Sequence, residues 1–301
     1  MDKIAVIILH YQNNEDTKEC LSSLFTNHKK TDNLHTFVVS NSPVNKLSEF
    51  IEKKYPQVEI LENQDNLGFA QGVNLGIKKA LDNNCNYIIL LNNDTLLAKD
   101  TITQLVSFAK VHQSVGLVSP KIYFAPGFEY HKDRYKTEDK GRVLWYAGGI
   151  IDWANIYAMH RGVDEIDKGQ FDEVRDTDFA TGCCLLIKRE VIEQIGLFDE
   201  KYFLYFEDID FSLRAKRREF RVVYFPKAHL WHKNAETSGK PGSALHIYYQ
   251  TRNRLYFGYK YATFRAKKAL FFDSLRLFLK GKIYRKAVAD YYLGRMGKGT
   301  I

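Results

Sequence analysis

Cysteine is scarce in this sequence of 301 residues, which contains four. No two of them form the Cys-x-x-Cys pair of a zinc site, and their spacing lacks the pattern of a disulfide framework. Cys183 and Cys184 lie next to each other in an apolar run. Buried thiols that act as small hydrophobic side chains are favoured there over a redox pair. We therefore expect reduced cysteines and a cytoplasmic protein.

Long apolar runs are also missing. No stretch approaches the ~20 apolar residues of a membrane-spanning helix. The first residues, Met1 to Lys3, lead directly into the short run IAVIIL, which is too short for a secretory signal. We expect a chain that is neither exported nor threaded through a bilayer.

Basic residues outnumber acidic ones, giving a formal net charge of +8. Such an excess suits nucleic acid, anionic lipid or phosphorylated small molecules. Much of it follows residue 252, where Lys and Arg alternate with aromatic residues and Leu in a helical pattern. Helices there either pack as an appendage with a solvated basic face or lie on anionic headgroups at the inner face of the cell membrane. Both interpretations stay open.

Strand and helix patterns alternate through the first 115 residues. Short apolar strands are predicted at 4–9, 36–39, 58–61 and 87–91, and amphipathic helices at 17–26, 47–55 and 70–83. This order predicts an α/β fold with a Rossmann-like, mainly parallel central sheet flanked by helices. The polar segments HYQNN, SNSPVN, NQDNLG and NNDT follow the four strands. Because ligands of such sheets gather at the carboxyl ends of strands, the four loops should face one crevice.

The alternation breaks after residue 115. We interpret 124–178 as loops and short strands that shape a second pocket, followed by a strand at 179–187, a helix at 189–195 and a strand at 221–224. The chain is therefore divided into residues 1–115, 116–240 and a helical extension, 241–301. Five aromatic residues offer either a platform for a sugar or simple packing of these loops. They are Tyr123, Tyr130, Trp145, Tyr146 and Trp153.

Three groups of polar residues suggest chemistry. Asp94 follows a buried strand in the sequence Asn92-Asn93-Asp94, where it either ligates a divalent cation or belongs to an Asx turn. Glu207 and Asp208 lie among aromatic residues. Burial there would raise a carboxyl pKa and create a general base, although acids also stabilise a helix start.

The third group is AHLWH, which contains His229 and His232. A histidine that follows a strand is either structural or able to complete a metal site with Asp94.

These segments together resemble glycosyltransferase family 2, and especially its rhamnosyltransferase-like members. The resemblance covers roughly residues 3–257 and rests on IILHYQN, NQDNLGFAQGVN, YIILLNNDT, GLVSPKI, the long block from FATGCC to HLWH, and YYQTRNRLYF. It implies the GT-A fold, with a nucleotide-sugar site in the first half and an acceptor site in the second. The block around FDE and EDID is the most specific part.

The resemblance also implies roles for individual residues. Asp208 matches the general base, with Glu207 beside it, and Asp94 and His232 match ligands of Mg²⁺ or Mn²⁺. The donor, a dTDP- or UDP-sugar, is expected on residues of the four loops and on the RN pair. These residues are His10, Tyr11, Asn13, Ser40, Asn41, Asn66, Gly68, Gly72, Asn74, Asn92, Asn93 and Arg252.

One position departs from the family pattern. Ser40 stands where the family commonly has Asp, so base identity and donor affinity are in doubt. The expected function is an inverting transfer to a glycan or lipid-linked saccharide in cell-surface polysaccharide synthesis, rhamnose being one candidate sugar.

The alternatives are an inactive or partner-dependent member of the fold and a nucleotidyltransferase. The latter should carry a basic, Gly-rich loop near the N-terminus, which HYQNNED lacks. Nucleic acid is not an expected partner, because it would leave the paired acidic motifs unexplained.

Overall fold

The chain is described by a computed structural model that covers residues 2–28, 33–42, 45–234 and 242–301. One mixed sheet has the strand order β10-β12-β6-β11-β4-β1-β2-β3. These strands are β1 (Ile4–His10), β2 (Leu34–Ser40), β3 (Val58–Glu62), β4 (Tyr87–Asn92), β6 (Val115–Phe124), β10 (Arg175–Asp176), β11 (Cys184–Lys188) and β12 (Arg221–His232). Two short strands, β5 (Thr95–Leu97) and β7 (Leu144–Tyr146), pair with β12 and β6.

The sheet is mainly parallel, as predicted. Strands β4, β1, β2 and β3 run parallel to one another, and β6 is parallel to β12. Strand β11 runs antiparallel to both β4 and β6, so it joins the two parallel groups. The carboxyl ends of β1, β2 and β4 therefore lie together at one edge.

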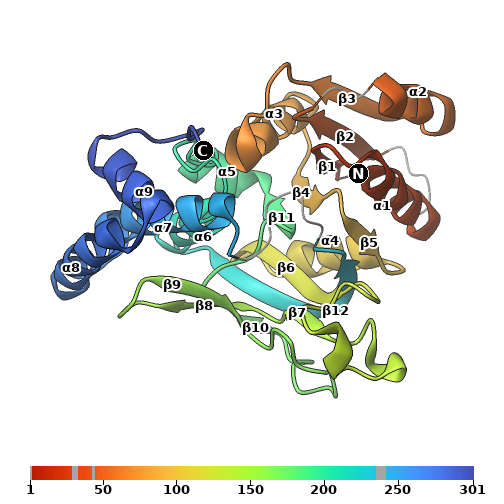
Figure 1. Cartoon of the computed structure of the whole chain (residues 1–301). Coiled ribbons are helices and arrows are strands. Elements are labelled where there is room, and N and C mark those ends of the chain that lie inside the picture. The colour runs from red at the N-terminus through yellow and green to blue at the C-terminus, as the bar shows by residue number, and fades with distance from the viewer. Residues whose placement is uncertain (1, 29–32, 43–44, 235–241) are drawn as a thin grey trace.

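Helices cover both faces of the sheet (Figure 1). Alternate residues of β1 point to opposite sides: Val6 packs in one core cluster and Ile7 in another. On the side of Val6 lie α1 (Asn14–Asn27), α2 (Asn45–Lys54) and α4 (Thr101–Val111). On the other side lie α3 (Gly68–Asp82), α5 (Arg189–Ile195) and α6 (Glu207–Lys216). Apolar strands buried on both faces are the reason that the sequence shows continuous apolar runs there.

The predicted strands and helices before residue 92 are all present, with ends shifted by a few residues. The predicted break at residue 115 is wrong for the segment that forms β6. That strand contains Pro120 and Lys121, which interrupt the apolar pattern expected of a buried strand. Lys121 is buried because it pairs with Asp167. Strand β12 continues well beyond 224, through an irregularity in register between Phe225 and His229.

The C-terminal extension is helical, as expected. It comprises α7 (Ala244–Tyr261), α8 (Phe264–Lys280) and α9 (Lys282–Tyr292). Side chains of Ser243 and Thr263 cap α7 and α8 by accepting hydrogen bonds from backbone N–H groups. The end of the chain returns to the main body, where the N–H of Gly297 donates to the Lys201 carbonyl at 2.9 Å. None of the helices in the described ranges is both long and apolar enough to cross a membrane.

The segment between β6 and β11 holds a hairpin of β8 (Gly149–Asp152) and β9 (Tyr157–His160). The turn of this hairpin reaches the C-terminal helices, because the guanidinium of Arg254 in α7 donates to the Asn155 carbonyl at 2.7 and 3.0 Å. The hairpin and α7 therefore form one packed unit beside the sheet.

Candidate functional site

The polar loops that follow β1, β2, β3 and β4 line one pocket, as predicted from the strand pattern. Tyr11, Asn41, Asn66 and Asn92 come from the four loops in turn, and the cavity measures about 640 Å³. The opposite wall is built by the start of α6 and by the first turns of α7. The pocket therefore lies at the carboxyl edge of the sheet, where ligands of α/β folds bind.

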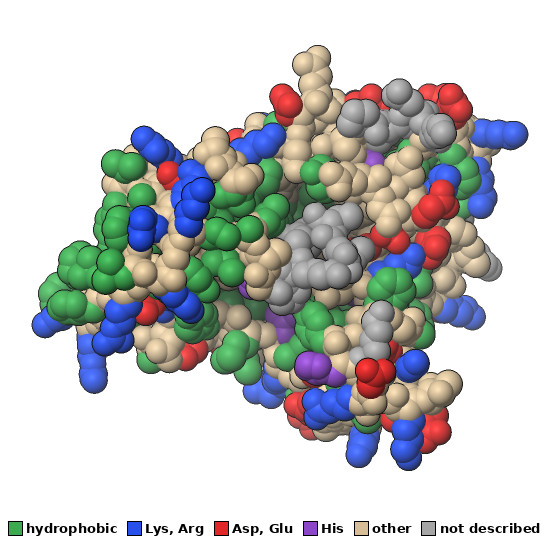
Figure 2. Space-filling view, viewed as in Figure 1, with side chains coloured by type: hydrophobic (Ala, Val, Ile, Leu, Met, Phe, Trp, Pro, Cys, Tyr) green, Lys and Arg blue, Asp and Glu red, His purple; other side chains and the backbone are tan. Residues whose placement is uncertain are grey.

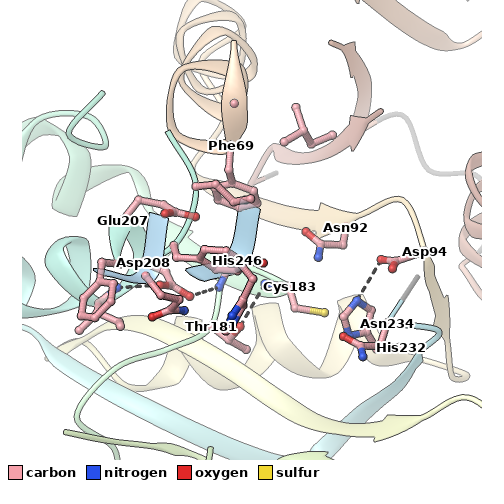
Figure 3. Close-up of a pocket in the computed structure, with 18 of the residues that line it drawn as sticks. Phe69, Asn92, Asp94, Thr181, Cys183, Glu207, Asp208, His232, Asn234 and His246 are labelled. Carbon is pink, nitrogen blue, oxygen red and sulfur yellow. Dashed lines mark hydrogen bonds and ion pairs between the residues drawn. The ribbon is translucent and has the colours of Figure 1, made fainter. Parts of the chain in front are cut away.

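Two acidic groups face this pocket from opposite sides (Figure 3). Glu207 and Asp208 lie at the start of α6, and Asp94 lies after β4, with Cys183 between them. Burial holds the pKa of the Cys183 thiol well above its usual range, so this sulfur stays protonated and is a poor nucleophile. The chemistry of the pocket therefore rests on its carboxyl groups and histidines.

The position of Asp208 depends on an unusual turn just before α6. Tyr205 and Phe206 both have left-handed backbone conformations, with φ of 69° and 74°. For residues with large side chains such conformations cost on the order of 1–3 kcal/mol each, so the surroundings must hold them. Three successive carbonyls are held: that of Phe203 accepts from the Phe69 N–H at 2.8 Å, and those of residues 204 and 205 accept from the side-chain amide of Asn253 at 2.8 and 2.9 Å.

The two carboxyl groups of the turn differ in environment. Asp208 is half-buried, and its carboxylate oxygens accept hydrogen bonds from the N–H groups of Gly182 at 3.0 Å and Ile209 at 2.9 Å. Glu207 is only 5% exposed, and its Oε2 has no hydrogen-bond partner among the described residues. Burial, and then the charge of Asp208, raise the pKa of Glu207 well above its usual range. Burial also raises the pKa of Asp208, but its two N–H donors oppose this.

The second acidic group pairs with a histidine. Nε2 of His232 lies 3.0 Å from Oδ1 of Asp94, and the edge of Trp145 packs against the imidazole with ring centroids 4.5 Å apart. The pairing arises because the end of β12 bonds to β5, which directly follows Asp94. Both side chains are less than 10% exposed and both reach the pocket.

The side chains of Asp94 and His232 fit a divalent cation. An octahedral ion holds neighbouring ligand atoms at right angles, each about 2.1 Å from the ion, so that the two atoms lie about 3 Å apart. Nε2 of His232 and Oδ1 of Asp94 have this separation. Nδ1 of His232 is buried and has no partner in the part of the chain that is described. It can therefore carry the ring proton and leave Nε2 free to bind a cation. Within the described ranges, no group of three His, Cys, Asp or Glu side chains could by itself hold a metal ion.

The loop before α3 is shaped by glycine and asparagine. Gly68 has φ of 76°, and a side chain there would meet the Phe203 carbonyl at 2.3 Å. Asn66 accepts from the Gly68 N–H at 2.9 Å, and Asn41 donates to the Gly68 carbonyl at 2.8 Å. A side chain at Gly72 would meet Leu9 at 2.7 Å, so this glycine lets α3 approach the end of β1. The predicted donor loop is therefore tied directly to the turn that carries Asp208.

Ten of the sixteen predicted site residues line the pocket: Tyr11, Asn41, Asn66, Gly68, Asn92, Asn93, Asp94, Glu207, Asp208 and His232. Gly72 packs behind the pocket, as described above.

Four other predicted residues lie outside it. His10 is buried against the Thr17 hydroxyl at 2.7 Å, and Asn13 caps α1. Ser40 is buried and donates to the Ser42 carbonyl. Asn74 exchanges two hydrogen bonds, each of 3.0 Å, with the backbone of Phe198. These residues support the loops from behind, and any direct contact with a donor stays a prediction.

Arg252 also lies away from the pocket. It is fully buried and donates to its neighbour Asn253 at 3.1 Å, while its guanidinium lies over the rings of Tyr248 and Tyr249, about 5 Å from each. Sequence reasoning matched the RN pair to diphosphate binding. In the structure Asn253 connects α7 to the turn before α6 and Arg252 donates to Asn253, so a contact of Arg252 with diphosphate stays a prediction.

Several lining residues were not predicted. Thr181, Gly182 and Phe69 lie beside the acidic turn, and His160 and His246 lie on the side of the hairpin and α7. Of the proposed aromatic platform, Tyr130 and Trp145 reach the pocket, whereas Trp153 stacks on Phe257 in α7. Among them only Gly182 gave a sequence signal, because it directly precedes the apolar run CCLLI.

Comparison with known proteins points to one family. A family model described as "Glycosyltransferase like family 2" matches residues 2–258. The chain is 25% identical over 257 residues to the "Low-salt glycan biosynthesis hexosyltransferase Agl10" of Haloferax volcanii, covering 84% of this chain and 75% of that one. It is 26% identical to an "N-acetylglucosaminyl-diphospho-decaprenol L-rhamnosyltransferase" of Mycobacterium tuberculosis, covering 66% of each chain.

Solved structures share the fold. A crystal structure of GalNAc-T7 with UDP, GalNAc and Mn²⁺ aligns with a TM-score of 0.66 and 15% identity, covering 97% of this chain and 55% of that one. The mannosyltransferase PcManGT from Pyrobaculum calidifontis, in complex with GDP-Man and Mn²⁺, aligns with a TM-score of 0.57 and 15% identity over 99% of this chain and 76% of its own. At these identities the likeness confirms the GT-A fold.

The buried carboxyl of Glu207 should make stability depend on pH. Its pKa is raised on folding, so its contribution is fully present below about pH 4 and is lost as the pH rises towards the folded-state pKa. Glu207→Gln cannot ionise and escapes this loss. We expect the variant to gain stability relative to the parent between about pH 4 and pH 8, measured by urea unfolding.

The matched control is Glu52→Gln, which makes the same change at an exposed position of α2. A stability difference between Glu207→Gln and the parent that stays constant with pH would contradict a protonated, buried Glu207.

Proposed function

Because the chain belongs to glycosyltransferase family 2, we propose that it transfers a sugar from a nucleoside-diphosphate donor to a saccharide hydroxyl, with inversion at the anomeric carbon. The acceptor is a glycan or a lipid-linked saccharide. The observation that carries the proposal is one pocket with a base candidate, Asp208, on one side and the Asp94–His232 pair on the other. An in-line displacement needs a base on the acceptor side and positive charge on the leaving-group side.

Asp208, and not Glu207, is the base of this mechanism. Burial and the charge of Asp208 raise the pKa of Glu207 and so favour its protonated form, which cannot take up a further proton. Asp208 is half-buried, faces the pocket and has a carboxylate stabilised by two N–H donors. As the acceptor oxygen bonds to the anomeric carbon, its proton passes to Asp208 and the bond to the diphosphate oxygen breaks. The protonated Glu207 beside it adds no competing negative charge.

Asp94 and His232 would hold a divalent cation, Mg²⁺ or Mn²⁺, in this proposal. When bound, the cation neutralises charge on the departing nucleoside diphosphate. Because only these two side chains of the described residues would hold the ion, they suit one that arrives together with its substrate. The two GT-A structures with Mn²⁺ are consistent with such an ion.

The donor would lie along the loops after β1 to β4, with its diphosphate close to Asp94. Asn66 and Asn92 offer polar contacts there, whereas the backbone N–H and carbonyl of Gly68 are already bonded to Asn66 and Asn41. We propose a dTDP- or UDP-sugar, with dTDP-rhamnose as the first candidate because a relative is named a rhamnosyltransferase. Ser40 is buried with its hydroxyl occupied, so the base of the nucleotide must be recognised by other groups.

The acceptor would enter between the hairpin and α7. Trp145, Met159 and Leu245 line that side and provide apolar surface for the faces of a sugar ring. His160 lies there too, and burial lowers its pKa to about 4, so it is neutral and can only hydrogen-bond. A lipid-linked acceptor would place synthesis of a cell-surface polysaccharide at a membrane.

Replacing Asp208 should remove the base and keep the fold. We expect Asp208→Asn to lower the rate of nucleoside diphosphate release by ~10²- to 10⁴-fold, measured with dTDP-rhamnose and the common UDP- and GDP-sugars in the presence of Mg²⁺ or Mn²⁺. The matched control is Asp82→Asn, on the exposed end of α3. Near-parent turnover of Asp208→Asn would rule out this assignment.

Replacing either proposed metal ligand should weaken the response to metal. We expect Asp94→Asn and His232→Gln each to raise the Mn²⁺ concentration needed for half-maximal activity by about 10- to 100-fold, and a chelator to stop the parent enzyme. The control is His112→Gln, an exposed histidine after α4. Unchanged Mn²⁺ dependence in both variants would contradict a metal at this pair.

A further inference from the structure

Helix α8 has a second apolar face whose large side chains are exposed, from 38% to 85% of their surface. Its buried residues, such as Ala266, Leu270 and Ser274, face α7 and α9. Six exposed apolar residues lie on the opposite side. At 3.6 residues per turn their spacing places them within one arc of about 120°. They are Phe264 (85% exposed), Phe271 (43%), Phe272 (52%), Leu275 (49%), Phe278 (38%) and Leu279 (78%). We call these six residues the α8 outer face.

The whole net charge of the protein is carried by residues 264–301, which include α8 and α9. Residues 264–301 contain ten Lys and Arg but only two Asp and no Glu, an excess of +8, which equals the net charge of the entire chain. The remaining residues hold 34 basic and 34 acidic side chains. Both acids of the segment are engaged: Asp273 pairs with Arg254 at 2.6 Å and Asp290 with Lys286 at 3.0 Å. The free charge here is therefore positive.

Basic residues border the apolar arc closely. Arg265 and Arg276 follow it on one side, Lys267 lies on the other, and Lys268 is exposed within it. Figure 2 shows the same pattern over the C-terminal helices, where a green apolar surface is edged by blue Lys and Arg. A long Lys or Arg side chain can keep its charge at headgroup level while its stem lies along apolar surface.

We propose that the α8 outer face lies on a bilayer that contains anionic lipid. The face inserts its Phe and Leu side chains at the boundary of headgroups and acyl chains, while the bordering Lys and Arg contact lipid phosphates. Charge complementarity selects this occupant. A second copy of the chain would bring two surfaces of the same sign together, whereas anionic lipid neutralises the surface. If the proposed function holds, this surface places the enzyme where a lipid-linked acceptor would be.

The α8 outer face is connected mechanically to the pocket. Helix α7 carries the pocket residues Leu245 and His246 at its start and packs on α8 further along. Arg254 of α7 links three elements, because it binds the hairpin carbonyl of Asn155, pairs with Asp273 of α8 and lies 4.3 Å from the ring of Tyr157. Trp153 and Tyr157, both in the hairpin, are 40% and 50% exposed beside this junction. Aromatic residues of this kind favour the membrane interface.

Sedimentation of the full chain with vesicles, without donor, tests the proposal. We expect binding to vesicles of equimolar phosphatidylcholine and phosphatidylglycerol, weak binding to phosphatidylcholine alone, and a loss of binding at about 0.5 M NaCl. Phe272→Ser/Leu275→Ser/Leu279→Ser should lower the partition coefficient by about 10- to 100-fold. The control is Val111→Ser/Val174→Ser, which removes exposed apolar side chains elsewhere.

The possible outcomes separate the two proposals. Absence of binding to anionic vesicles, equal binding to both compositions, or equal loss in the control would overturn the membrane surface. A parent dimer that the triple variant converts to a monomer, measured by light scattering and without vesicle binding, would overturn it in favour of self-association. Nucleoside diphosphate release with a water-soluble acceptor should be unchanged in the triple variant, which shows that it is folded. Vesicle binding by a protein that releases no nucleotide would leave this surface intact and contradict only the proposed function.

Discussion

Two side-chain hydrogen bonds from Asn253 hold the turn on which the site depends. Its amide donates to the carbonyls of Leu204 and Tyr205, while the backbone at Phe69 holds that of Phe203. The turn then passes through two left-handed residues and starts α6 with Glu207 and Asp208 at the pocket. Without external support, a turn with such conformations would relax and its carboxylates would point elsewhere.

The same turn joins regions that the sequence presents as separate. The Phe69 contact comes from the loop proposed to bind the donor, and Asn253 belongs to the C-terminal helices. The proposed base is therefore positioned by the loop before α3 and by helix α7. This makes α7 part of the site, and it gives the α8 outer face a rigid connection to the place where an acceptor would bind. Helix α7 then connects the α8 outer face, where lipid would bind, to the pocket, where the sugar would be transferred.

Sequence patterns predicted the sheet well because its central strands are apolar on both faces and its loops begin with polar residues. They also predicted that Asp94 and the loops after β1 to β3 share one crevice, since carboxyl ends of parallel strands share an edge. The place of Glu207 and Asp208 in the site was implied only by the family resemblance. The two hydrogen bonds from Asn253 to the turn could not be predicted from such sequence patterns. They need two segments almost 50 residues apart to meet, and a single Asn carries no periodic signal. Strand β6 was missed for a related reason, because the buried Lys121 is neutralised by the distant Asp167 and Asp172.

The most direct test replaces Asn253 by alanine and measures turnover and donor KM separately. A shift of about 1 Å in a catalytic group can cost about 10²-fold, so we predict that kcat of Asn253→Ala falls by about that factor while donor KM stays near the parent value. Asn83→Ala is the matched control, since it removes a side-chain amide that donates to the Lys79 carbonyl at 2.8 Å far from the pocket. A folded Asn253→Ala variant with the kcat of the parent would contradict the role of the turn.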